Sequence, residues 1–149
     1  MATEVPLKVL ALIKLREGWK TTVYLDTRGF PTAGTGHLLS VAERTQYPVG
    51  ATVPDDILTA WENNDTLSAY NAAIGQANVI GLNDQRLIDG LTPVNFQLGD
   101  SFYKHFPKMW SDLLAHNWSG AADEAQDSAW YAETKVRVED FQAVLRSLG

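Results

Sequence analysis

The chain has 149 residues, of which 45% are hydrophobic and 20% charged, and it carries a formal net charge of −6 and no cysteine. That length can bury a sizeable core, so we expect one domain or two closely joined lobes. The lack of cysteine excludes a disulfide framework, a thiolate zinc site and a cysteine nucleophile. The acidic charge is spread along the chain without a basic stripe, which argues against a nucleic-acid partner.

The first forty residues change from a helical to a strand pattern. Apolar residues recur at helical spacing over residues 6–17, and Gly18 follows as a helix stop. Residues 23–25 and 30–35 have the composition of strands, and the turn residues Asp and Gly lie at the two ends of 26–29. The sequence therefore predicts a helix followed by a β-hairpin.

The remainder of the chain is predicted to be mainly helical. A weak pattern indicates a short helix at 41–45, and Pro54 begins a stronger and longer one. The later helices are expected from Asn83 or Asp84 to Gly99, from Pro107 to Leu114, from Ala121 to Tyr131 with Ser119 as its cap, and after Thr134.

These elements predict an α+β fold that forms a single domain over residues 1–149. It has a small N-terminal lobe with a β-hairpin sheet at about 15–53 and a long linking helix at about 54–75. A helical C-terminal lobe follows at about 82–149, with the first helix, about 6–17, packed on it. A cleft is expected between the lobes.

Two acids in the N-terminal segment could act together. Glu17 ends the first helix and Asp26 begins the hairpin turn, and a helix-to-hairpin step can bring such acids to face each other across a gap. That is the geometry that glycoside hydrolysis needs. Their spacing alone fits an accidental pair equally well. His37 alone is typical of a buried structural histidine, and Thr32 alone of a strand threonine.

The combined order is more specific than its parts. The pattern E-G-x7-D-x2-G-x2-T-x-G-x-G-H, from Glu17 to His37, resembles the active-site segment of phage-type lysozymes, the endolysins of glycoside hydrolase family 24. The lysozyme of T-even phage is the best known of these. Further matches follow in the order of the family: Phe96-Gln97-Leu98-Gly99, Trp118, Trp130-Tyr131 and Arg137.

The resemblance implies a role for each matching residue. Glu17 matches the general acid, Asp26 the second carboxylate and Thr32 the threonine that helps to place the attacking water, in a reaction that inverts the anomeric centre. The supporting residues are Arg137, which reaches back to the glutamate, His37, which pairs with an acid, and Gln97 at the base of the cleft. Leu38 and Phe96 match residues that contact sugar.

The resemblance also implies a lysozyme-like fold and an activity. The expected reaction is hydrolysis of the β-1,4 bond between N-acetylmuramic acid and N-acetylglucosamine in bacterial peptidoglycan, for host cell lysis. We expect no metal and no organic cofactor, because the three histidines are scattered and no dinucleotide motif occurs.

The expected partners are peptidoglycan glycan strands, without a membrane anchor. The apolar run at residues 9–13 is too short for a membrane span and wrong for a signal peptide. We therefore expect a monomer that stays in the host cytoplasm until a separate holin releases it to the periplasmic cell wall.

The sequence departs from the family pattern at two positions in the C-terminal lobe, and three alternative functions stay open. The T-even enzyme has serine where Met109 lies and asparagine where Glu124 lies, so the sugar contacts of the C-terminal lobe are expected to differ.

A lytic transglycosylase on the same scaffold is one alternative, although Asp26 and Thr32 argue against it. A non-catalytic wall-binding module and an unrelated helical domain with an accidental acid pair are the others.

Overall fold

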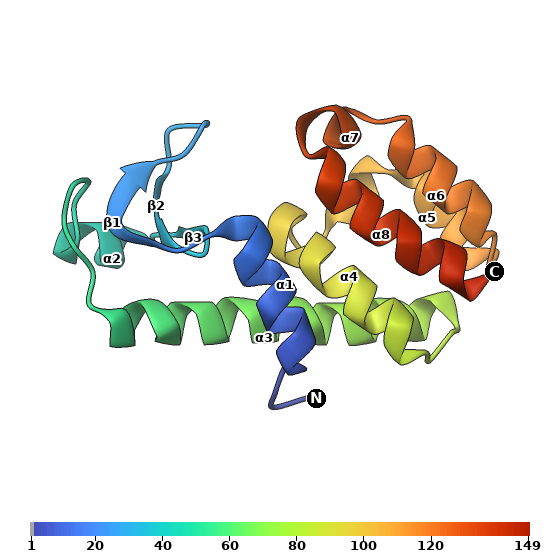
Figure 1. The fold of residues 1–149 in the computed structure, drawn as a ribbon, viewed down its shortest axis with the longest axis horizontal. Coiled ribbons are helices and arrows are strands. Elements are labelled where there is room, and N and C mark those ends of the chain that lie inside the picture. Colours follow the sequence, from blue (N-terminus) through green and yellow to red (C-terminus); the bar gives the residue numbers. More distant parts are fainter. Residues whose placement is uncertain (1) are drawn as a thin grey trace.

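A computed structural model describes residues 2–149 of the protein. Over these residues the chain forms eight α-helices, one short 3-10 helix and one three-stranded sheet, arranged around one long helix (Figure 1). In chain order they are α1 (Leu7–Glu17), β1 (Lys20–Leu25), β2 (Pro31–Gly34), β3 (His37–Leu38), α2 (Val41–Gln46), α3 (Asp55–Ile80), α4 (Gln85–Leu98), η1 (Phe102–His105), α5 (Pro107–Leu114), α6 (Trp118–Gln126), α7 (Ala129–Glu133) and α8 (Lys135–Leu148). The α+β fold class is confirmed.

Helix α1 ends where the sequence predicts. The N–H of Gly18 donates to the carbonyl of Lys14 at 2.8 Å, and Gly18 has φ 78°, a conformation that glycine adopts without strain. Because β1 begins two residues later, Glu17 lies at the junction of helix and sheet. Helix α1 packs against α4, and in Figure 1 it crosses in front of α3 on its way to β1.

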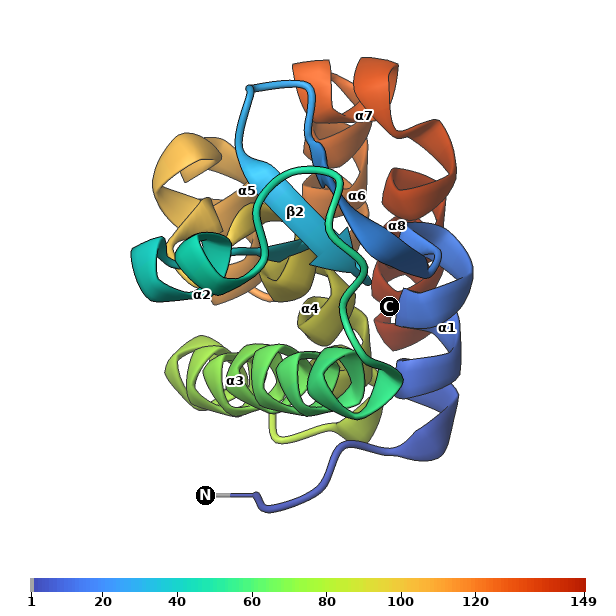
Figure 2. The same ribbon diagram turned by 90° about the vertical axis from the view of Figure 1, so that its left-hand side faces the viewer.

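The sheet is antiparallel with the order β1-β2-β3. The first two strands form the predicted hairpin. The third strand was not predicted, because a strand of two residues is too short to show an alternating pattern. Figure 2, which looks along α3, shows β2 in front of the helical part.

The pairing register defines the two faces of this sheet. Thr32 in the central strand is paired with Tyr24 on one side and with Leu38 on the other. Directly opposite residues of an antiparallel sheet share a face, so these three side chains lie together. The opposite face belongs to a small core, in which Val23 and Ala33 are buried with Leu39, Val53 and Leu58.

Helix α3 connects this small core to a larger helical one. It has 26 residues and ends at Gly81, which adopts a left-handed conformation, so it extends five residues beyond the predicted end near 75. This extension was not predicted, because the polar residues Gln76 and Asn78 interrupt the apolar pattern of the last turns. Ala73, Ala77 and Ile80 of α3 pack in the larger core. No helix within residues 2–149 has the length and apolar character of a membrane span.

The C-terminal helices follow the prediction with one correction. The predicted helix from Ala121 to Tyr131 with Ser119 as its cap is wrong, because two helices occupy this segment. Helix α6 begins at Trp118, where the Asn117 side chain accepts a hydrogen bond from the N–H of Gly120 at 3.1 Å. The Ser128 hydroxyl accepts from the N–H of Tyr131, and this second cap starts α7.

Candidate active site

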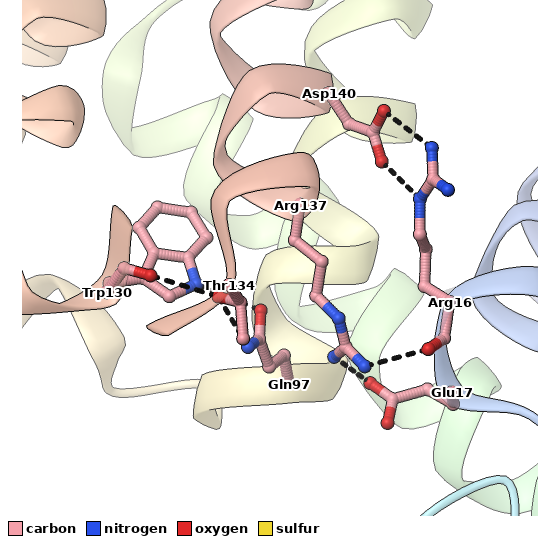
Figure 3. A network of polar contacts seen from close by, with 7 residues as sticks. All are labelled: Arg16, Glu17, Gln97, Trp130, Thr134, Arg137 and Asp140. Atoms are coloured by element: carbon pink, nitrogen blue, oxygen red, sulfur yellow. Dashed lines mark hydrogen bonds and ion pairs between the residues drawn. The ribbon is translucent and has the colours of Figure 1, made fainter. Parts of the chain in front are cut away.

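Glu17 is held from the far end of the chain by Arg137. The guanidinium of Arg137, on α8, donates through Nη1 to Oε1 of Glu17 and through Nη2 to the carbonyl of Arg16 at 3.0 Å (Figure 3). The Glu17 side chain retains 16% of its exposure, so the pair is shielded but reachable from solvent. Arg16 itself pairs with Asp140, one turn further along α8, which fixes the end of α1 a second time.

The second oxygen of Glu17 faces the turn between β2 and β3. A Cβ atom added at Gly36 would lie 3.1 Å from Oε2 of Glu17. Gly36 also has φ 85°, so both its backbone conformation and its lack of a side chain suit this position. The acid is therefore fixed between α8 and the small sheet.

Asp26 is held by the backbone of its own turn. Its Oδ1 atom accepts hydrogen bonds from the N–H groups of Arg28 at 2.9 Å and Phe30 at 2.8 Å. Its own N–H donates to the carbonyl of Phe30, which continues the strand pairing by one residue. Among residues 2–149, Oδ2 has no protein hydrogen-bond partner. The carboxylate thus has one anchored oxygen and one that is available to a ligand.

Thr32 lies on the same face of the sheet as Asp26. It is 2% exposed because it occupies the central strand between Tyr24 and Leu38. Its hydroxyl donates to the carbonyl of Phe30 at 2.8 Å. The lone pairs of the hydroxyl oxygen can still accept a hydrogen bond.

Tyr24 is a site residue that the sequence analysis missed. Burial raises the pKa of its phenol, and the charges of Glu17 and Asp26 raise the pKa further. Both carboxylates are therefore near enough to this phenol for their charges to raise its pKa. The two-residue spacing between Tyr24 and Asp26 along one strand was the available signal.

The predicted sugar contacts come together from distant parts of the chain. Leu38 from β3 and Phe96 from α4 line one groove of about 370 Å³. The polar side chains Asp65, Asn95 and Asp100 line the same groove. The two predicted contacts are thus brought to one place, beside the carboxylates of Asp65 and Asp100, which can accept hydrogen bonds.

A second, apolar pocket of about 190 Å³ lies between α1, α4 and α8. Glu17, Arg137, Phe96 and Gln97 all border it. Phe96 therefore lines both spaces. Asp26 and Thr32 border neither of these two spaces.

His37 is paired with two acids where the resemblance implies one. Its Nδ1 lies 2.7 Å from Oδ2 of Asp65 on α3, and its Nε2 lies 2.9 Å from Oε1 of Glu43 on α2. The ring stacks on Trp61 with centroids 4.4 Å apart. Burial lowers the pKa of His37, but the hydrogen bonds to Asp65 and Glu43 more than offset this, and the net direction is upward.

Gln97 connects α4 with α7 and the start of α8. Its Oε1 accepts from the indole N–H of Trp130 at 2.9 Å, and its Nε2 donates to the hydroxyl of Thr134 at 3.2 Å (Figure 3). The hydroxyl of Thr134 in turn donates to the carbonyl of Trp130. These hydrogen bonds hold Gln97 in place, next to Phe96 in the chain.

The two positions that depart from the T-even enzyme take different roles. Met109 is 1% exposed and belongs to the larger core, so its side chain contributes very little surface. Glu124 forms an ion pair with Lys108 at 2.8 Å. Both line the same surface groove next to Trp130.

The architecture, with a small antiparallel sheet, a long helix and a larger helical part, is consistent with the lysozyme-like fold that the sequence predicts. No family model matches the chain. Over 125 residues, 84% of its length, the chain is 26% identical to the peptidoglycan hydrolase gp36 of Pseudomonas phage phiKMV. Over 148 aligned residues it is also 26% identical to the pre-baseplate central spike protein Gp5 of Enterobacteria phage T4. The matched regions are 14% and 25% of those two proteins, so the chain spans only a small part of either relative.

Proposed function

We propose that the protein is a peptidoglycan muramidase that hydrolyses the β-1,4 bond between N-acetylmuramic acid and N-acetylglucosamine. The observation that carries the proposal is that Arg137 holds the Glu17 carboxylate against the turn between β2 and β3, next to the sheet whose hairpin carries Asp26 and Thr32. Glycoside hydrolysis needs two carboxyl groups on either side of the scissile bond, and the resemblance assigns these roles to Glu17 and Asp26. The similarity to a phage protein named a peptidoglycan hydrolase supports the wall polymer as substrate.

In the proposed reaction Glu17 is the general acid. It gives its proton to the glycosidic oxygen as the bond between that oxygen and the anomeric carbon breaks. A water held by Asp26 and Thr32 forms a bond from its oxygen to the anomeric carbon, and its proton passes to Asp26. Attack from the face opposite to the leaving group inverts the anomeric centre.

Arg137 has two functions in this proposal. In the free enzyme its guanidinium holds the Glu17 carboxylate in place. For Glu17 to donate a proton, the acid must first be protonated, and the ion pair must loosen when substrate enters. The contact of Arg137 with the carbonyl of Arg16 keeps the guanidinium at the site in both states.

The test is Glu17→Gln, assayed on purified peptidoglycan with mass spectrometry of the products. The amide keeps the size of the side chain but has no acidic proton, so turnover should fall by at least about 1,000-fold with the fold retained. The exposed Glu133 provides a matched control, because Glu133→Gln should leave turnover unchanged. An active Glu17→Gln enzyme would falsify the assignment.

The same products separate the proposal from a lytic transglycosylase. Hydrolysis leaves a reducing-end muramic acid that has gained the elements of water. A transglycosylase leaves an internal anhydro ring of lower mass. Wall binding without any released fragment would instead indicate a non-catalytic module.

A further inference from the structure

The set of hydrogen-bonding groups around the proposed water position lacks a donor. Asp26 offers Oδ2, which accepts only. The hydroxyl of Thr32 has already donated its hydrogen to the carbonyl of Phe30, so it too can only accept. A water between these two groups can give a hydrogen to each. Nothing in the pair donates a hydrogen bond to the water oxygen, and two contacts alone leave the water free to rotate about the line that joins them.

Tyr24 lies where such a donor is needed. It is the direct cross-strand neighbour of Thr32, and it precedes Asp26 by two residues along the same edge of the hairpin. Strand alternation puts Tyr24 and Asp26 on one face, and cross-strand pairing puts Thr32 on that face too. The phenol therefore belongs to the face of the sheet that carries both proposed water ligands.

The hydroxyl of Tyr24 is also free to serve a ligand. Over residues 2–149 it makes no hydrogen bond to another protein group, and the residue is only half-buried. Because this hydroxyl has no protein hydrogen-bond partner among these residues, it can form a hydrogen bond to a bound water or sugar. Burial and the charges of Glu17 and Asp26 raise the pKa of Tyr24, so the phenol keeps its proton.

We propose that the Tyr24 hydroxyl donates the third hydrogen bond that holds the attacking water against Asp26 and Thr32. The inference rests on the proposed function and extends it by one residue. The water then gives one hydrogen to Oδ2 of Asp26 and one to Oγ1 of Thr32, accepts one from Tyr24, and keeps one lone pair for the anomeric carbon. When that bond forms, the proton goes to Asp26 and Tyr24 retains its own.

If the attacking water is held less firmly, a hydroxyl group of the substrate itself should react at the anomeric carbon more often in its place. Once the glycosidic oxygen has taken the proton of Glu17 and left, the 6-hydroxyl of the muramic acid can bond to the same anomeric carbon from the face that the leaving group vacated. Its proton returns to Glu17, and the anhydro ring closes without a bound water. Removal of the Tyr24 hydroxyl should therefore slow hydrolysis and raise the share of anhydro product. A purely structural role for Tyr24 would lower both routes together.

The experiment compares wild-type enzyme with Tyr24→Phe on purified glycan strands. The variant keeps the ring over Thr32, and circular dichroism melting checks that the fold is kept. We expect kcat to fall about tenfold, KM to stay within about twofold, and the ratio of anhydro to hydrolysed ends to rise. Tyr103→Phe is the matched control, because Tyr103 is a partly buried tyrosine that stacks on Trp110 in the helical part, and it should leave all three values unchanged.

The outcomes separate the inference from the function on which it rests. If the wild-type enzyme cleaves the glycan but Tyr24→Phe has a kcat within about twofold of it, the role of Tyr24 is refuted and the muramidase proposal stands. A change confined to KM, or a slower reaction with an unchanged product ratio, also refutes it. A wild-type protein that releases no fragment overturns both.

Discussion

Gly36 lies directly against the carboxylate of Glu17, so a side chain at that position would crowd the acid. A Cβ atom on Gly36 would come within 3.1 Å of Oε2, a separation at which one of the two groups must move. The turn between β2 and β3 thus limits where the proposed acid can lie, just as Arg137 does from the other side.

Gly36→Ala should therefore reduce activity more than stability. Its φ of 85° costs alanine roughly 1–2 kcal/mol, and the displaced Glu17 carboxylate should lower kcat by about 10–100-fold. Gly50→Ala is the matched control, since Gly50 has φ 93° and a Cβ added there would meet nothing within 4 Å. Thermal melting and turnover are compared for both variants. Equal activity of the two would show that the contact with Glu17 has no consequence.

The pairing of His37 should make stability depend on pH. The folded-state pKa of His37 is raised, so its bonds to Asp65 and Glu43 contribute fully below the unfolded pKa of about 6.5 and are lost as pH rises through the folded-state value. We expect His37→Gln to cost roughly 1–2 kcal/mol at pH 6, a modest value because both acids are partly exposed.

That cost should shrink as the pH rises toward 9, when the wild-type ring becomes neutral. Denaturant unfolding at pH 6, 7.5 and 9 measures it. His105→Gln is the control, because His105 is exposed and forms no ion pair within the described residues. A difference between His37→Gln and wild type that is constant over this range would contradict the assignment of a charged histidine.

Gln97→Leu should destabilise the helical part. The substitution leaves the buried indole N–H of Trp130 without its acceptor, which costs about 1–3 kcal/mol. Denaturant unfolding followed by tryptophan fluorescence reports the loss. Gln46→Leu is a suitable comparison, because Gln46 is exposed and its only side-chain hydrogen bond within residues 2–149, to the hydroxyl of Tyr47, is long at 3.4 Å. If the two variants were equally stable, the hydrogen bond between Gln97 and Trp130 would make no measurable contribution to the free energy of unfolding.

Gly90 and Gly75 both lie in helices, but alanine should have opposite effects on stability at the two positions. A Cβ at Gly90 would lie 2.7 Å from Cγ1 of Val144 on α8, so Gly90→Ala should cost about 1–3 kcal/mol through overpacking. Gly75 has nothing within 4 Å, and Gly75→Ala should stabilise α3 by about 0.5–1 kcal/mol. Melting temperatures should move in opposite directions, and the loss at Gly90 should be partly recovered by Val144→Ala.

Local features of the chain were predicted well from sequence. The ends of α1 at Gly18 and of α4 at Gly99 follow from glycine, and the hairpin follows from the turn between Asp26 and Gly29. These features depend on neighbours within a few residues. The resemblance added Arg137, which no local pattern connects to an acid 120 residues earlier.

The features that escaped prediction depend on distant or very short contacts. Glu43 and Asp65 were not recognisable as partners of His37, because α2 and α3 bring them there only in the folded chain. The strand β3 exists because two residues pair with β2. Tyr24 was overlooked because its significance depends on Thr32 across the ladder.

The junction of α1 and β1 divides the proposed reacting groups between two bodies of the molecule. Glu17 is bound to the helical core through Arg137, whereas Asp26, Thr32 and Tyr24 are carried by the sheet at the other end of α3 (Figure 1). A bend or twist of that helix would therefore change the separation of the two carboxylates. For the proposed enzyme, a glycan that contacts both bodies would set the angle between them by being bound.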